Sequence, residues 1–166
     1  MADGADKIVG RTLSSIDEIG AVQWNALANP SPETYNPFVS HEFLSALEAS
    51  KSVSAETGWA PMHLVVEDAG ELIGAAPLYA KGHSQGEYVF DHHWADALHR
   101  AGGRYYPKLL SAAPFTPVPG PRLLAKTAET KATLAGLLRE AAAQLGMSSA
   151  HANFITEKDK AILDAA

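Results

Sequence analysis

The stretch GEYVFDHHWADALHRAGGRYYPKLLSAAPFTPVPGP, residues 86–121, concentrates residue types that a hydrophobic core does not need. It holds five of the ten prolines of the chain, and residues 79–115 hold seven of the thirteen aromatics. Four of the seven histidines lie within residues 83–99. Residues 81–126 contain six Lys or Arg and three Asp or Glu, although the whole chain has a net charge of −6. We therefore expect the functional site in this stretch.

The pattern of the stretch predicts a strand, a helix and a second strand. Residues 88–91 and 108–113 are short runs typical of strands, and residues 92–101 have helical character and end before two glycines. Such a unit is expected to be parallel and right-handed, with ligands beyond the carboxyl ends of its strands. Those ends are residues 90–91 and 113–116, so topology and composition indicate the same place.

The segments outside this unit predict a mixed order of helices and strands. Before it we expect a strand over residues 7–13, a helix from the S-x-x-E capping box at Ser15 to Ala28, a helix beginning at Ser40, and a hairpin of residues 62–67 and 71–79. After it we expect a helix over residues 128–145, a strand over 148–155 and a helix over 156–166. The fold class is therefore α/β (α+β), with a mixed sheet flanked by helices. Residues 1–12 are assigned to a tail and the first strand, and residues 13–166 to one domain.

Composition excludes several classes of protein. A chain of 166 residues suits one domain with a sizeable core. It has no cysteine, which excludes disulfides, thiolate catalysis and cysteine-ligated zinc. The net charge of −6 argues against general nucleic-acid binding. No apolar run approaches the ~20 residues of a membrane span, and the acidic N-terminus lacks the apolar segment of a secretory signal. A cytoplasmic location is expected.

Three segments carry a family resemblance: NPFVSHEFLSALE (residues 36–48), GAAPLYAKGHSQGEYVFD (74–91) and RYYPKLLSAAPFTPVPGPRLL (104–124). They resemble the FemAB-like predicted N-acyltransferases of the GNAT superfamily, a bacterial-type family linked to peptidoglycan biosynthesis or recognition. The resemblance covers nearly the whole chain from about Leu13. It implies a GNAT-like fold and the transfer of an acyl or aminoacyl group to the amine of a small molecule or peptide, such as a peptidoglycan precursor.

The resemblance also bears on the acyl donor. Acetyl-CoA-dependent GNAT enzymes place a glycine-rich loop after the fourth strand, where backbone N–H groups hold the pyrophosphate. If residues 88–91 are the fourth strand, Asp91 and His92 stand where the glycine-rich loop would be. A carboxylate at that position would repel phosphate. Acetyl-CoA is therefore disfavoured as the donor. The expected donor is an acyl-CoA or, as in Fem-type relatives, aminoacyl-tRNA.

The resemblance further implies that this chain corresponds to the N-terminal part of a longer architecture. Part of the active site is then expected elsewhere. Sheet edges left open at the C-terminal end suggest a homo-oligomer, because unpaired strands recruit partners.

Glu87, Asp91 and Tyr106 are the catalytic candidates. Residues four apart on a strand project from one face, so Glu87 and Asp91 could together accept a proton or bind a substrate ammonium. Asp91 also suits the N-cap of the helix that begins at His92, and the two roles can coexist. Tyr106 could protonate a leaving group, although buried packing better suits its place at the start of a strand.

The substrate-binding candidates lie near the expected strand ends or in the proline-rich loop, whose φ angles are fixed. Alternation along the strand would put Tyr106 and Lys108 on one face and Tyr105 on the other. Arg122 could bind a carboxylate or phosphate, with a solvated arginine as the alternative. The candidates are Tyr79, Lys81, Ser84, Phe90, Trp94, Lys108, Phe115, Thr116 and Arg122.

No metal is expected, although histidines are abundant here. Consecutive histidines such as His92 and His93 do not share a helix face, and His99 lies two turns away. A second interpretation of the whole chain is a GNAT-shaped binding module that recognises a cell-wall precursor or a partner domain without catalysis. Binding of CoA would favour the enzyme, whereas precursor binding without CoA affinity would favour the module.

Overall fold

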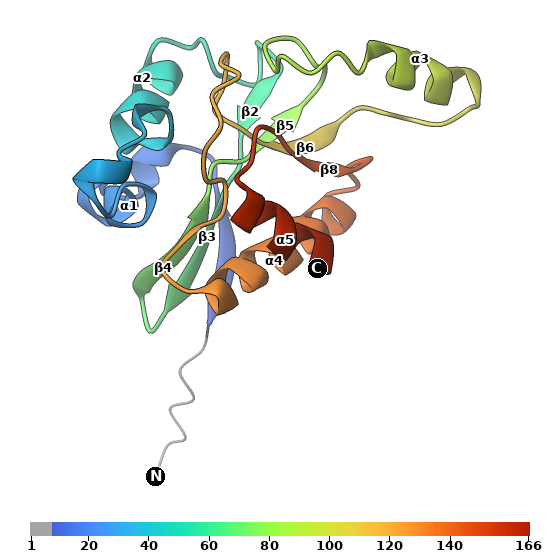
Figure 1. Cartoon of the computed structure of the whole chain (residues 1–166). Helices are drawn as coiled ribbons and strands as arrows, with labels where there is room; N and C mark the ends of the chain where they lie inside the picture. Colours follow the sequence, from blue (N-terminus) through green and yellow to red (C-terminus); the bar gives the residue numbers. More distant parts are fainter. Residues whose placement is uncertain (1–7) are drawn as a thin grey trace.

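The computed structural model describes residues 8–166, in which five α-helices surround a bent arrangement of strands (Figure 1). The α-helices are α1 (Ala21–Ala28), α2 (His41–Ala49), α3 (His92–Arg100), α4 (Ala128–Gln144) and α5 (Glu157–Ala165). The strands are β1 (Val9–Leu13), β2 (Trp59–Pro61), β3 (His63–Asp68), β4 (Glu71–Ala76), β5 (Tyr79–Lys81), β6 (Lys108–Ser111), β7 (Leu124–Ala125) and β8 (Ala150–Ala152). The predicted α+β class is confirmed.

Two short links join strands of one four-stranded sheet directly to strands of another. The first sheet has the antiparallel order β1-β3-β4-β7, and the second has the order β2-β5-β6-β8. β2 leads into β3 through Met62, and β4 leads into β5 through Pro77 and Leu78. Proline has no N–H group and interrupts a ladder, so the sheet changes direction there. A backbone hydrogen bond of 2.8 Å from Met62 N to Leu78 O joins the two links at the bend.

Helices cover both faces of the first sheet. Side chains alternate along β3, so Val65 packs in one hydrophobic cluster with α1 and α2, and Leu64 and Val66 pack in another with α4. Trp24 of α1 and Leu134 of α4 are both fully buried. Because burying one such side chain contributes roughly 1.5–3 kcal/mol, these two clusters supply most of the stabilising burial.

The helix termini agree with the sequence patterns. Ser15 and Glu18 form the predicted capping box, although it caps a 3-10 helix (Ile16–Glu18), because Ile19 and Gly20 are extended before α1 begins. The hydroxyl of Ser40 caps α2 as predicted. The predicted helices that became α3, α4 and α5 are confirmed to within one residue at each end.

The parallel strand–helix–strand unit was predicted around α3, but the structure forms it around α4. Residues 88–91 form no strand, since Tyr88 has a left-handed φ of 57° that interrupts extended backbone. The strand before α3 is β5, which runs antiparallel to β6. The parallel pair is β6 and β8, and the chain crosses between them through β7 and α4. The predicted strands at 108–113 and 148–155 are shorter than expected, and β7 was not predicted.

α3 projects from the second-sheet end of the molecule, away from the other helices (Figure 1). No residue described in α3 is buried. Every helix in residues 8–166 is too short or too polar to cross a membrane. Val9–Leu13 confirms the predicted first strand, whereas Lys7 and the predicted tail before it lie outside the described residues.

Candidate functional site

Two buried lysines lie side by side on one face of the second sheet. The register pairs Lys81 of β5 with Lys108 of β6, and Trp59 of β2 with Lys81. Both lysines have a relative exposure of 0%. A buried ammonium is costly unless it is paired and hydrogen-bonded, and the loop before α3 supplies the partners, Glu87 and Asp91.

The ammonium of Lys108 is the centre of this ion cluster. Its Nζ donates to Glu87 Oε2 at 2.9 Å, to Asp91 Oδ2 at 2.8 Å and to Ser84 Oγ at 2.9 Å. An ammonium has three donors, so all of them are used. Ser84 Oγ also shares a 2.7 Å hydrogen bond with the hydroxyl of Tyr106. Lys108 therefore fixes the loop to the sheet.

Lys81 occupies the closed end of the cluster. Its Nζ lies 3.5 Å from the centre of the Trp59 ring and donates to Gln85 O at 3.3 Å. Glu87 Oε1 is 3.9 Å away. Burial lowers the pKa of Lys81 to about 7 despite this carboxylate. Burial also raises the pKa of Glu87 above its usual range. Lys81 therefore gains and loses its proton near neutral pH, unlike an exposed lysine.

Asp91 occupies the more open end of the cluster. It stands at the N-cap of α3, but its carboxylate makes no cap hydrogen bond to the described chain, so side-chain capping was predicted wrongly. It accepts instead from Lys108 and, at 2.7 Å, from the hydroxyl of Tyr105. Burial alone would raise the pKa of Asp91, but these hydrogen bonds outweigh it and lower the pKa to about 2. Asp91 is therefore an anion at neutral pH.

Two carboxylate oxygens of the cluster have no hydrogen-bond partner within residues 8–166. They are Glu87 Oε1 and Asp91 Oδ1, and both are buried. Buried polar atoms in proteins are nearly always hydrogen-bonded, and unpaired ones concentrate where a ligand supplies the partner. Asp91 Oδ1, at the more open end, can accept a hydrogen bond from an incoming ammonium or amine, whereas the Glu87 side chain has no exposed surface.

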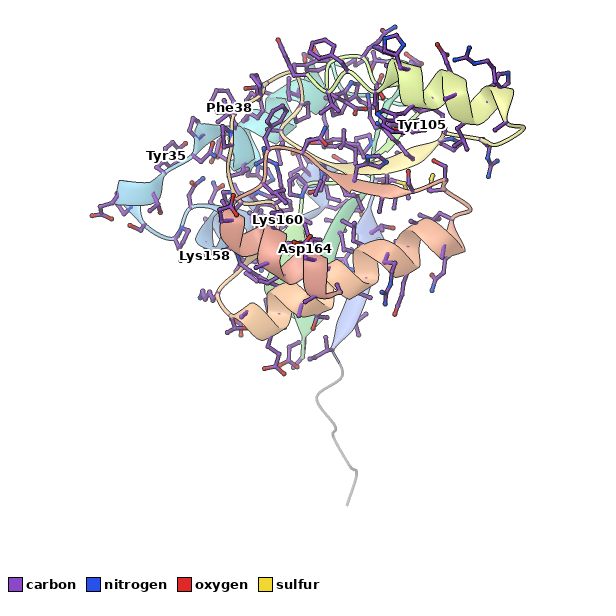
Figure 2. The ribbon with its side chains drawn as sticks, turned by 45° about the vertical axis from the view of Figure 1, so that its right-hand side comes forward. Tyr35, Phe38, Tyr105, Lys158, Lys160 and Asp164 are labelled. Atoms are coloured by element: carbon purple, nitrogen blue, oxygen red, sulfur yellow. The ribbon has the colours of Figure 1, made fainter. Side chains whose placement is uncertain are left out.

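The prediction that Tyr105 and Tyr106 lie on opposite faces of a strand is wrong. β6 begins only at Lys108, so strand alternation does not extend to the two tyrosines. Both hydroxyls reach the cluster, Tyr105 at Asp91 and Tyr106 at Ser84. Figure 2 shows Tyr105 beneath α3. Burial and the hydrogen bond to Asp91 raise the pKa of Tyr105, so it remains a hydrogen-bond donor at neutral pH.

A cavity of about 390 Å³ adjoins the cluster, with Ser84 common to both. Gly86, Tyr88 and Phe115 line it, and all three have left-handed φ angles, of 77°, 57° and 60°. Bulky residues rarely adopt this conformation, and such strain is concentrated at binding sites. Phe115 N donates to Gly86 O at 3.1 Å, which clasps the proline-rich loop to the loop before α3.

The remaining substrate-binding candidates separate into three groups. Phe90 and Trp94 are exposed, at 84% and 74%, and Phe90 lines the cavity. Tyr79 is buried in the core against Trp59 and His63. Thr116 accepts a hydrogen bond from Val118 N inside its own loop.

Arg122 is neither solvated nor open to an anion. It is 1% exposed, and its guanidinium donates to Val118 O at 2.9 Å and to Asn153 O at 3.2 Å. Burial lowers the pKa of Arg122 to about 10. Its role is to brace the proline-rich loop, so the predicted binding of a carboxylate or phosphate is replaced by a structural one.

Three further residues of the site were not singled out from the sequence. Trp59 covers Lys81, Tyr105 holds Asp91, and the ring of His151 on β8 lies 6.1 Å from that of Tyr105. Trp59 and His151 lie far from the loop in the sequence, so no local pattern connects them with it. Tyr105 was missed because the assumed strand alternation placed it on the face opposite Tyr106 and Lys108. No three His, Asp or Glu side chains in residues 8–166 are grouped as a metal site requires.

A family model described as FemAB-like, peptidoglycan biosynthesis/recognition, matches residues 15–166. The chain belongs to the FemAB-like family. Membership connects this FemAB-like protein with peptidoglycan biosynthesis or recognition, and the GNAT-like order of its elements is consistent with it. No curated protein and no solved structure matches the chain.

Proposed function

We propose that this FemAB-like protein takes part in N-acyl transfer, moving an acyl or aminoacyl group to the amine of a peptidoglycan-precursor peptide. The observation that carries the proposal is the ion cluster, with its two unpartnered carboxylate oxygens on Glu87 and Asp91. A substrate ammonium would satisfy Asp91 Oδ1 and meet a local negative charge, because Asp91 stays ionised at neutral pH.

The cluster also supplies a proton acceptor. In the reaction, the amine nitrogen forms a bond to the acyl carbon while the bond from that carbon to the leaving group breaks. The substrate ammonium loses one proton before it attacks and a second proton afterwards. The leaving group takes one of these two protons. Lys81, with a pKa of about 7, can hold the other proton at the closed end of the cluster.

The donor is proposed to be aminoacyl-tRNA or acyl-CoA. The helix that crosses between the parallel strands is α4, so a phosphate-binding loop would lie between β7 and α4, and the earlier placement at Asp91 is wrong. The link there is Lys126-Thr127, with Thr127 as the N-cap and no glycine. This link lacks the glycines of a pyrophosphate loop, which favours aminoacyl-tRNA.

One observation favours the alternative of a binding module without catalysis. All three donors of Lys108 are satisfied by the protein itself, and the Glu87 side chain is fully enclosed. Such a cluster is stable without a substrate. In that case Asp91 Oδ1 would recognise a precursor amine, and no transfer would follow.

The test combines a panel of peptide amines with aminoacyl-tRNA or acyl-CoA, and product is followed by mass spectrometry. Asp91→Asn is expected to raise KM for the amine, and Lys81→Met to lower kcat by about 10²-fold, the usual size of a general-base contribution. Arg11→Ala, which removes an exposed ion pair with Glu67, is the control and should match wild type. Absence of transfer together with absence of binding to either donor would refute the enzyme. Saturable binding of the peptide without donor binding would establish the module.

A further inference from the structure

A serine and a histidine form a hydrogen-bonded pair at the outer strand of the second sheet. Ser149 Oγ and His151 Nε2 are 2.7 Å apart. The backbone holds both in place: Leu109 N donates to Ser149 O at 2.9 Å, and His151 is in register with Leu110 of β6. β8 is the last strand of this sheet in residues 8–166, so the pair lies at its edge.

The surroundings of His151 suit a general base. Accepting the Ser149 hydroxyl proton requires an unprotonated Nε2 and hence the proton on Nδ1. Burial, together with the charge of Lys108, lowers the pKa of His151, which keeps the ring neutral at physiological pH. On its other side stand Tyr105 and, beyond it, the Asp91 carboxylate with its unpartnered Oδ1. The Asp91 charge favours the imidazolium that forms when the ring takes a proton, whereas the charge of Lys108 opposes it more strongly.

An apolar cavity opens beside the pair. It measures about 530 Å³ and lies between α4, β8 and α5. Ser149 and His151 line it together with Leu138, Met147, Ile155 and Leu163. Its size is within the range of small-molecule sites, and an alkyl or acyl chain matches its lining. Neither Ser149 nor His151 takes part in the hydrogen bonds of Lys108 that form the ion cluster.

We propose that Ser149 is a nucleophile, activated by His151, that accepts an acyl group whose apolar chain occupies this cavity. Ser149 Oγ attacks the acyl carbonyl carbon, and its proton passes to His151 Nε2. The bond between the carbonyl carbon and the leaving group breaks, and His151 returns the proton to the departing alcohol or thiol. The product is an acyl-serine ester.

The acyl-serine would then deliver its acyl group to an amine that enters beside Ser149. This second half rests on the proposed function, whereas the first half does not. In it, the neutral amine attacks the ester carbon and gives one proton to His151 Nε2, the bond to Ser149 Oγ breaks, and His151 passes that proton to the serine oxygen.

The experiment treats the 166-residue chain with an alkyl fluorophosphonate, which esterifies activated serines with loss of fluoride. We expect one adduct by intact mass, mapped to Ser149, no adduct in Ser149→Ala, and labelling at least 10-fold slower in His151→Gln. Ser45→Ala is the matched control, because the hydroxyl of this serine on α2 donates to the Asp17 carboxylate rather than to a histidine, and it should label like wild type. Circular dichroism checks the fold of each variant.

The pH dependence of wild-type labelling gives a measurement that needs no variant. The rate should rise with pH through a midpoint below that of an ordinary histidine, since burial lowers the pKa of His151. No adduct, an adduct on another serine, or equal rates in wild type and His151→Gln would overturn the inference. Acyl transfer to amines without an acyl-serine would also overturn it but leave the proposed function intact. An acyl-serine that no amine discharges would support it and count against the proposed function.

Discussion

The carboxylate of Asp91 accepts a 2.8 Å hydrogen bond from Lys108 in place of capping the helix that Asp91 begins. Lys108 belongs to a central strand of the second sheet, so this contact and the one to Glu87 tie the whole loop before α3 to the sheet. The loop has little apolar burial of its own, and its position depends on buried charge. The first two predictions follow from that dependence.

Lys108→Met should strongly destabilise the fold. The change leaves two buried carboxylates without their cation, and breaking a buried ion pair costs about 3–5 kcal/mol. Urea unfolding measures the loss. Adding Glu87→Gln and Asp91→Asn should restore much of it, because the stranded charges disappear. Arg11→Ala, at an exposed pair, should stay close to wild type. Equal losses in Lys108→Met and Arg11→Ala would contradict the central role of Lys108.

Lys81 should make the protein more stable as the pH rises above 7. An unfolded lysine keeps its proton up to about pH 10.4, whereas in the folded protein the pKa of Lys81 is lowered to about 7. Between these values the unfolded state binds the extra proton, so the free energy of unfolding increases with pH. Urea titrations at pH 7 and pH 9 measure the slope. Lys81→Met should have a shallower slope, and an unchanged slope would show that Lys81 is charged in the fold.

Gly86→Ala should cost more stability than Gly102→Ala. Both glycines have left-handed φ angles, of 77° and 81°, so both pay a similar backbone cost of about 1 kcal/mol. A Cβ at Gly86 would lie 2.6 Å from Phe115 Cδ1, whereas nothing lies within 4 Å at Gly102. The clash should add roughly 1–2 kcal/mol. Thermal unfolding compares the two, and Phe115→Ala in the Gly86→Ala background should remove the difference.

Asp159→Ala should release the end of the proline-rich loop. Asp159 is fully buried and accepts from Arg122 N at 2.7 Å, Leu123 N at 3.1 Å and Lys131 Nζ at 2.9 Å. Leaving these donors unpaired should cost about 3–5 kcal/mol in urea unfolding.

Two variants calibrate the Asp159 measurement. Asp159→Asn retains an acceptor oxygen for the amides but loses the charge opposite Lys131, so it should cost less than Asp159→Ala. Asp164→Ala removes only the exposed pair with Lys160 on the outer side of α5, visible in Figure 2, and should stay near wild type. If Asp159→Ala lowered the free energy of unfolding as little as Asp164→Ala, other contacts would hold the end of the proline-rich loop.

Local patterns in the sequence predicted the helices well. The cap at Ser40, the box at Ser15 and the apolar stripe of α4 act within a few residues, so they can be read directly. Composition also indicated residues 79–126 as the candidate site, and the structure gathers Lys81, Ser84, Glu87, Asp91, Tyr106 and Lys108 of this stretch into one ion cluster.

Contacts between distant residues could not be predicted in the same way. The carboxylates of Glu87 and Asp91 meet at Lys108 because a loop folds over the sheet, and not because a strand aligns them. Arg122 is buried by residues on β8 and its own loop, which no local pattern reveals.

α3 has no buried residue in the part of the chain that the structure describes, and this allows α3 to unfold locally. Its backbone hydrogen bonds can break without exposing either main hydrophobic cluster, so its amides should exchange with solvent far faster than those of α4. Asp91 and Tyr105 stand at the two ends of this segment. Local unfolding of α3 would therefore uncover the anionic end of the ion cluster while the rest of the protein stays folded.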